Sequence, residues 1–163
     1  MASTLILGLG NLILGDDGLG VRMIERLLEQ YALPAQVEAI EGGTLGLHLL
    51  PYLEGVQALL IIDAIWADQP PGSLIRLEGE ALPVALNDTM SPHQFGLAEL
   101  LAVGSLYGPM PQRIVLWGIV PASMEFGLEL SEPVAAKLDE LMAQLVAELA
   151  GWGIRLQPRS DEA

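Results

Sequence analysis

Residues 8–20 read GLGNLILGDDGLG, with five glycines and two adjacent aspartates, Asp16 and Asp17, in one short stretch. The apolar run Ser3–Leu9 leads into this stretch and predicts a buried parallel strand. Beyond the stretch, apolar residues recur every three or four positions, as in an amphipathic helix. These residues are Val21, Ile24, Leu27, Leu28 and Tyr31. A strand, a glycine-rich loop and a helix in this order indicate an α/β fold.

The rest of the chain continues this alternation. Further strands are predicted at Val37–Ile40, Val56–Ile62, Ser73–Leu77 and Arg113–Val120. Further helices are predicted from Thr44 to Leu50, from Ser91 onward, and along an apolar face formed by Val134, Leu138, Leu141, Leu145 and Leu149. This order predicts one domain over residues 1–163, with a mainly parallel, twisted sheet of about five strands covered on both faces. We expect the most apolar strand, Val56–Ile62, at the sheet centre and a loosely ordered tail over residues 151–163.

Composition and charge exclude several classes of function. The most apolar run, Ala58–Ile62, ends at Asp63 and is far shorter than the roughly 20 residues that span a bilayer. The pattern of a secretory signal is missing, so we expect a cytoplasmic protein without a membrane partner. A formal net charge of -14 disfavours nucleic acid, because binding to its phosphates depends on Lys and Arg. The chain has no cysteine, so a metal site would use carboxylate oxygen and imidazole nitrogen.

The glycine-rich loop is open to two interpretations besides metal binding. A dinucleotide fingerprint needs a third glycine where this chain has Ile13, and two carboxylates at that place repel a pyrophosphate. Alternatively, Asp16 or Asp17 caps the following helix. One aspartate is enough for a cap, so the second is expected to favour a cation at the carboxyl end of the strand.

Two further residues are expected near the same edge of the sheet, where ligands bind in open α/β folds. Asp63 follows a buried strand, and an ionised carboxylate there needs a partner. His93 lies in the first turn of a helix whose start is marked by Ser91, Pro92 and Gln94. Together, Asp17, Asp63 and His93 would suit a divalent metal such as nickel, zinc or manganese. The other histidine, His48, is interpreted as a packing or surface residue.

Five motifs in order along the chain resemble those of the hydrogenase maturation endopeptidases. They are Gly8-Leu9-Gly10-Asn11, Gly15-Asp16-Asp17-Gly18, Gly42-Gly43-Thr44, Ile62-Asp63-Ala64 and Ser91-Pro92-His93-Gln94. The resemblance covers nearly the whole chain and implies a three-layer α/β/α sandwich. It also implies a nickel-dependent protease of the aspartic or metallo type, which removes the C-terminal extension from the nickel-loaded precursor of a [NiFe] hydrogenase large subunit.

The resemblance implies roles for individual residues. Asp17, Asp63 and His93 would be both the metal ligands and the catalytic residues, and Glu41, Gly42, Gly43 and Thr44 would bind the substrate. Nickel would arrive with the precursor, and zinc or cadmium would substitute for it in vitro. Two positions depart from the common pattern of the family, because Asp17 replaces a frequent glutamate and Glu41 a frequent aspartate.

Two alternative functions are open at this point. In the first, the same three residues bind nickel but the protein does not cut the precursor. The chain would then be a nickel-binding hydrogenase assembly factor without catalytic activity. The opening segment LILGLGN also resembles that of peptidyl-tRNA hydrolases, but their following His-Asn segment has no counterpart here. The strongly acidic charge also makes tRNA a poor partner.

Overall fold

The computed structural model describes residues 3–79 and 92–159, with the backbone alone for residues 92–98. The strands are β1 (Thr4–Leu9), β2 (Tyr31–Ala32), β3 (Val37–Gly43), β4 (Ala58–Ala64), β5 (Leu74–Glu78), β6 (Arg113–Ile119) and β7 (Gln157–Pro158). The α-helices are α1 (Leu19–Gln30), α3 (Pro92–Tyr107), α4 (Glu132–Ala135) and α5 (Leu138–Gly151), and the 3-10 helices are η1 (Gly15–Gly18) and η2 (Gly46–Leu53). Among these, no helix has the length and apolarity that crossing a membrane requires.

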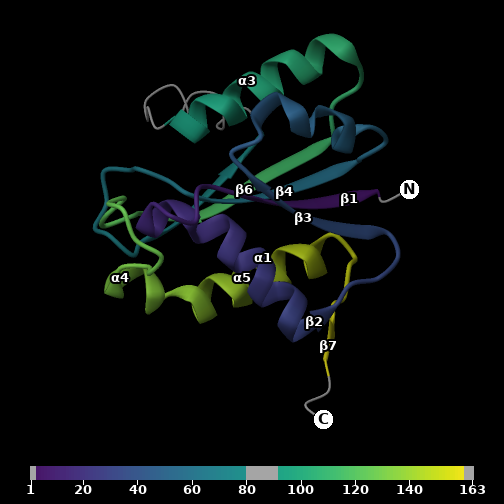
Figure 1. Cartoon of the computed structure of the whole chain (residues 1–163). Helices are drawn as coiled ribbons and strands as arrows, with labels where there is room; N and C mark the ends of the chain where they lie inside the picture. The colour runs from purple at the N-terminus through teal and green to yellow at the C-terminus, as the bar shows by residue number, and fades with distance from the viewer. Residues whose placement is uncertain (1–2, 80–91, 160–163) are drawn as a thin grey trace.

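The main sheet has five strands in the order β3-β1-β4-β6-β5 (Figure 1). The pairs β1–β3, β1–β4 and β4–β6 are parallel, and only the edge strand β5 runs antiparallel to its neighbour. The prediction of a mainly parallel sheet with its most apolar strand at the centre is therefore confirmed. Because Gly8 of β1 lies opposite Ile62 of β4, the two strands end at the same edge of the sheet.

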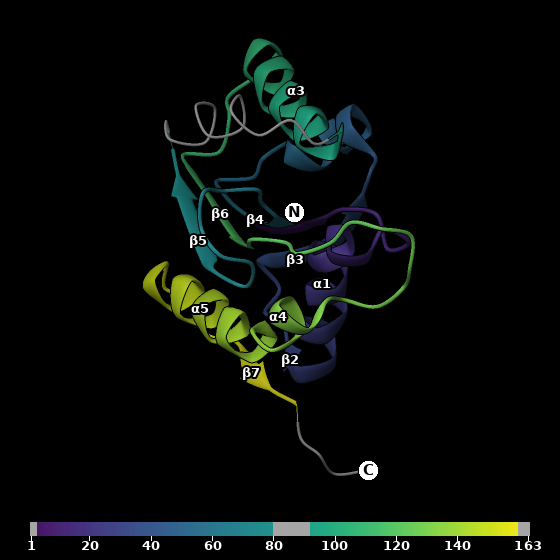
Figure 2. The same cartoon turned by 90° about the vertical axis from the view of Figure 1, so that its left-hand side faces the viewer.

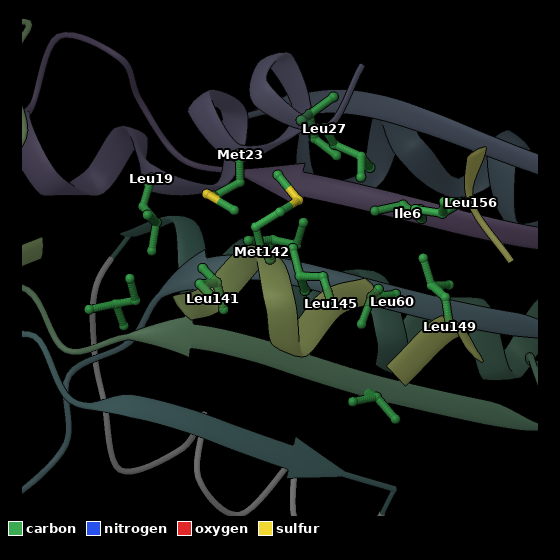
Figure 3. Packing of buried hydrophobic residues seen from close by; sticks show 14 of the residues in the cluster. Ile6, Leu19, Met23, Leu27, Leu60, Leu141, Met142, Leu145, Leu149 and Leu156 are labelled. Atoms are coloured by element: carbon green, nitrogen blue, oxygen red, sulfur yellow. The ribbon is translucent and has the colours of Figure 1, made fainter. Parts of the chain in front are cut away.

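Helices cover both faces of this sheet, so the chain forms the expected three layers (Figure 2). Helices α1, α4 and α5 pack on one face and contribute Met23, Leu27, Val134, Met142 and Leu145 to a buried core with Ile6 and Leu60 of the sheet. Figure 3 shows labelled side chains of α1 and α5 packed together on this face of the sheet. On the other face, η2 and α3 contribute Leu49, Leu53 and Leu100 to a second core.

Helix α1 packs closely on the sheet because glycines face each other at the contact. A Cβ atom added to Gly20 would lie 2.2 Å from the carbonyl oxygen of Ile62 and 2.3 Å from that of Leu9. One added to Gly8 would lie 2.3 Å from the carbonyl oxygen of Gly20. The first turn of α1 thus rests on the backbone of β1 and β4, near the point where both strands end.

Three segments differ from the sequence predictions. The helix expected from Thr44 is the 3-10 helix η2, which contains Pro51; a proline lacks the N–H that an α-helix would use there. The final apolar face is divided between α4, which carries Val134, and α5. The tail was expected to be loosely ordered from Gly151, but Ile154 and Leu156 are buried and β7 pairs with β2. Residues 160–163 lie outside the described part.

Candidate active site

The glycine-rich loop turns back on itself directly after β1. Gly10 has a φ of 120°, and a Cβ atom there would lie 1.7 Å from the carbonyl oxygen of Asp17. Its N–H donates to the carbonyl oxygen of Gly43 at the end of β3 (3.0 Å). Because glycine alone tolerates this conformation and this approach, Gly10 allows the loop to place η1 beside the carboxyl ends of the strands.

Asp17 is buried in η1 at this edge. Its Oδ2 accepts a hydrogen bond from the backbone N–H of Asn11 (3.0 Å), so the loop itself fixes the carboxylate. The alternative prediction that Asp16 or Asp17 is the N-cap residue of the helix is wrong, because the N-cap position of α1 is Gly18, which has no side chain for capping. Asp17 therefore has the location predicted for a metal ligand, next to the end of β1.

Asp63 is fully buried at the penultimate position of β4. This strand was predicted to end at Ile62, but β4 continues to Ala64 and includes Asp63. Its Oδ1 accepts the N–H of Ala64 (2.8 Å). Since η1 packs against β4, the elements that carry Asp17 and Asp63 meet at one edge of the sheet, as predicted.

His93 is the second residue of α3, which begins at Pro92. The helix start predicted from Pro92 is thus confirmed, while the predicted cap Ser91 lies outside the described residues. Helix α3 begins on the side of the molecule where β1 and β4 end (Figure 1). The side chain of His93 is not among those described. Among the side chains that are, there is no group of three His, Asp or Glu residues suited to hold a metal. The complete three-residue set therefore stays a prediction.

Asp16, the neighbour of Asp17, has a role that the sequence analysis missed. Its carboxylate is fully buried and accepts four hydrogen bonds. Oδ2 accepts the N–H groups of Ala122 (2.8 Å) and Ser123 (3.0 Å) and the hydroxyl of Ser131 (2.7 Å), and Oδ1 accepts the N–H of Ser131 (2.7 Å). Asp16 thus joins η1 to the loop that follows β6. The only signal in the sequence was a second aspartate beside Asp17.

The predicted substrate-binding residues follow one another at the end of β3, beside β1. Glu41 is exposed and lies opposite Gly8. Gly42 is buried against side chains of the core, Gly43 is partly buried and Thr44 is exposed. The register shifts between Gly8 and Leu9 of the neighbouring strand β1. Glu41 and Thr44 are therefore accessible at the same sheet edge as Asp17, as a substrate-binding role requires.

His48 is exposed on η2, in agreement with its interpretation as a packing or surface residue. It lines a groove of about 870 Å³ between η2 and the end of α3, together with Leu47, Leu50, Tyr107 and Met110. The residues that line this groove include none of the predicted site residues. His48 therefore offers a matched control for His93.

Outside this site, Glu148 of α5 is the centre of a polar network with β5 and β6. Its carboxylate accepts hydrogen bonds from Arg76 Nε (2.7 Å), Trp117 Nε1 (2.9 Å) and Trp152 Nε1 (3.1 Å). The hydrogen bond from Arg76 is the largest cause that holds the pKa of Glu148 below its ordinary value of 4.5. The same pair raises the pKa of Arg76. This network ties the edge strand β5 to the helical layer.

These features define a class of protein: a single three-layer α/β/α domain with three buried aspartates, Asp16, Asp17 and Asp63, at the carboxyl edge of a mainly parallel sheet. A model of the family described as hydrogenase maturation protease matches residues 21–148. The chain belongs to the hydrogenase maturation protease family.

Individual relatives agree with this assignment. The hydrogenase 2 maturation protease of Escherichia coli K12 is 36% identical over 156 residues, which cover 95% of each protein. The hydrogenase expression/formation protein HupD of Rhodobacter capsulatus is 40% identical over 93% of this chain and 73% of its own length. The structure of the hydrogenase maturating endopeptidase HybD from E. coli covers 99% of this chain and 100% of its own, with 37% identity and a TM-score of 0.93. The expected fold is thus confirmed.

Proposed function

We propose that this protein is an endopeptidase that removes the C-terminal extension of the nickel-loaded precursor of a [NiFe] hydrogenase large subunit, in the cytoplasm. The observation that carries the proposal is the placement of Asp17 and Asp63 at one sheet edge, in a chain whose fold matches a hydrogenase maturating endopeptidase. Nickel enters as part of the substrate, because it is bound by the precursor before cleavage.

The donor set fits such a metal. Asp17 and Asp63 provide carboxylate oxygens and His93 would add an imidazole nitrogen, a combination that suits nickel and also zinc or cadmium in vitro. Hydrogen bonds from Asn11 and Ala64 hold one oxygen of each carboxylate. Such fixed orientation is the usual way in which neighbouring groups prepare a ligand for its metal. Recognition of the metal would restrict binding to precursors that are ready to be cut.

The reaction adds water across the scissile peptide bond. The C–N bond breaks, the carbonyl carbon takes the hydroxyl group and the leaving nitrogen takes the proton. Bound nickel would supply positive charge that polarises the scissile carbonyl. Of this chain's residues, Asp17 and Asp63 fix the nickel-bearing end of the precursor, and one carboxylate of the pair accepts the proton of the attacking water. The segment Glu41–Thr44 binds the extended substrate on the β3 side.

The two histidines of the chain give a matched test. We expect that His93→Ala abolishes processing of the nickel-loaded precursor, because a metal ligand is lost, while the far-ultraviolet circular dichroism spectrum is unchanged. His48→Ala should process normally, since His48 is exposed and outside the site. Mass spectrometry of the precursor's C-terminus measures the outcome. Full processing by the His93 variant would refute the proposal.

The role of nickel is tested with precursor prepared without the metal. The wild-type protein should leave this precursor uncut and should cut it after nickel is added. Efficient cleavage of the metal-free precursor would show that recognition does not depend on nickel. Binding of the nickel-loaded precursor without any loss of mass would instead identify a non-catalytic assembly factor.

A further inference from the structure

Large apolar side chains are exposed on two loops beside the candidate site. Phe126 is 84% exposed and Leu128 63% exposed on the loop that follows β6, and Ile13 is 44% exposed on the loop that follows β1. We call these three residues the apolar ridge. Figure 2 shows the two loops running side by side at this edge of the molecule.

Backbone hydrogen bonds join the two loops at the ridge. The N–H of Gly127 donates to the carbonyl oxygen of Ile13 (2.8 Å), and the N–H of Gly15 donates to the carbonyl oxygen of Gly127 (3.0 Å). Gly127 lies between Phe126 and Leu128, so this pairing places the backbone of both residues next to Ile13. The backbone of the ridge is therefore held in one arrangement, while its side chains are exposed to solvent.

Asp16 provides the strongest connection between the loop and the site. Its four hydrogen bonds reach both ends of the segment from Ala122 to Ser131, and its own N–H donates to the carbonyl oxygen of Ser123 (3.0 Å). Hydrogen bonds to a buried charged acceptor are among the strongest in proteins. Asp16 and Asp17 are adjacent in η1, so the residue that fixes the loop is bonded covalently to the residue that would bind nickel.

We propose that the apolar ridge is a contact surface for the hydrogenase precursor, and that Asp16 is the positioning residue that holds this surface beside Asp17. The inference rests on the proposed function and adds the surface through which the substrate docks. Its occupant is the precursor because Gly15 and Asp16 bond the loop of the ridge to η1, the turn that carries Asp17. Exposed apolar side chains, aromatic ones above all, are typical of binding surfaces.

Charge defines the chemistry of the partner segment more closely. The loop from Pro121 to Ser131 carries Glu125 and Glu129 beside the ridge residues and contains no Lys or Arg. The whole chain has 21 acidic and 7 basic residues. The groove beside Leu128 is lined by three acidic residues, Glu25, Glu29 and Glu129, and by two basic ones, Arg22 and Arg26, of which Arg26 is paired with Asp139. Acidic residues therefore predominate around the ridge. Complementary potentials favour association, so the segment that covers the ridge is apolar with basic residues at its margins.

Photo-crosslinking tests the contact directly. A benzoylphenylalanine placed at Phe126 should crosslink to the nickel-loaded precursor on irradiation. The same probe at Leu106, which is 83% exposed on α3 but outside the ridge, should not. Cleavage of the precursor without a crosslink at Phe126 would overturn this inference and leave the proposed function intact. A crosslink without cleavage would support the ridge and refute the endopeptidase. If neither a crosslink nor cleavage is observed, both the docking surface and the proposed endopeptidase function are refuted.

Kinetics measure the contribution of the ridge. The double variant Phe126→Ala, Leu128→Ala should raise KM for the precursor at least about tenfold, as removal of an interface anchor does, with kcat within about twofold of wild type because the chemistry is untouched. Leu106→Ala should leave both constants unchanged. A wild-type KM in the double variant would contradict the docking role.

Asp16 is tested with its isosteric amide. In Asp16→Asn the amide group keeps one acceptor oxygen, but its NH2 group would face a backbone or hydroxyl donor of the loop. We expect KM to rise by a similar factor and chymotrypsin to cut after Phe126 at least about tenfold faster than in wild type, because loop opening limits such cleavage. Ser131→Ala removes one of the four hydrogen bonds to Asp16. Its KM and its rate of chymotrypsin cleavage should lie between those of wild type and Asp16→Asn. Unchanged KM and unchanged cleavage after Phe126 would show that Asp16 does not position the loop.

Discussion

Gly20 is the residue on which the position of the turn that carries Asp17 depends most clearly. In Gly20→Ala the new Cβ atom would start 2.2 Å from the carbonyl oxygen of Ile62, and ordinary contact begins at 3.4 Å. Helix α1 would therefore have to move away from the sheet by about 1.2 Å. The neighbouring atoms belong to the backbone of β1 and β4, so no flexible side chain can yield in their place.

The size of the effect follows from this displacement. Overpacking of a well-packed core costs about 1–3 kcal/mol, and each kcal/mol lowers the Tm of a domain of this size by roughly 2–4 °C. Because α1 follows η1 directly, its movement should also displace Asp17 and lower kcat for the nickel-loaded precursor by more than tenfold, since small misplacements of reacting groups are costly.

Gly151 provides the matched control for Gly20. It is the last residue of α5, and a Cβ atom there would meet nothing within 4 Å. Gly151→Ala should therefore raise stability by up to about 1 kcal/mol through helix propensity and leave processing unchanged. Thermal unfolding followed by circular dichroism and steady-state cleavage of the precursor measure both quantities. A Gly20 variant with the Tm and activity of wild type would refute the close packing of α1 as the feature that places Asp17.

Two further predictions concern single carboxylates. Asp63→Asn should abolish processing, measured by the mass of the precursor, because the proposed metal ligand is lost. Asp68→Asn, at an exposed position after the same strand, should process normally. Glu148 has a lowered pKa, so its contribution to stability is present above pH 4.5 and is lost as the pH falls through the pKa of the folded state. Glu148→Gln should accordingly have a lower Tm than wild type at pH 7, and the difference should shrink below pH 4.5. Glu140→Gln, at an exposed surface pair, should differ little from wild type at either pH. A difference in Tm between wild type and Glu148→Gln that stays constant from pH 7 to below pH 4.5 would contradict the stabilising role of the Glu148 network.

The main elements of the fold could be predicted because the spacing of apolar residues along the chain indicates which faces of a helix or strand are buried. The run around Leu60 is apolar on both faces of its strand, as a central parallel strand must be, and β4 is central. The strand boundary before Asp63 was wrong because a charged residue normally ends an apolar run. Here β4 continues past it, with the carboxylate bonded to the next N–H.

The site could be predicted only in part. Asp17 and Asp63 were placed correctly because the carboxyl ends of parallel strands meet at one edge. The function of Asp16 could not be predicted, since its partners Ala122 and Ser131 are 106 and 115 residues further along the chain, and only the folded chain brings them together. The assignment of Asp16 or Asp17 as the N-cap residue failed because both residues lie within η1, and Gly18 occupies the N-cap position of α1.

Crystals of the protein soaked with nickel or cadmium would show whether Asp17, Asp63 and His93 bind a metal together. We predict one metal ion bound by these three residues. The carboxylate and imidazole ligand atoms should lie roughly 2.0–2.2 Å from a metal the size of zinc or nickel, and slightly further from cadmium. Asp16 should not bind the ion, because its carboxylate is engaged by the loop. A metal bound by His48 or Asp16, with none between Asp17 and Asp63, would refute the proposed metal site.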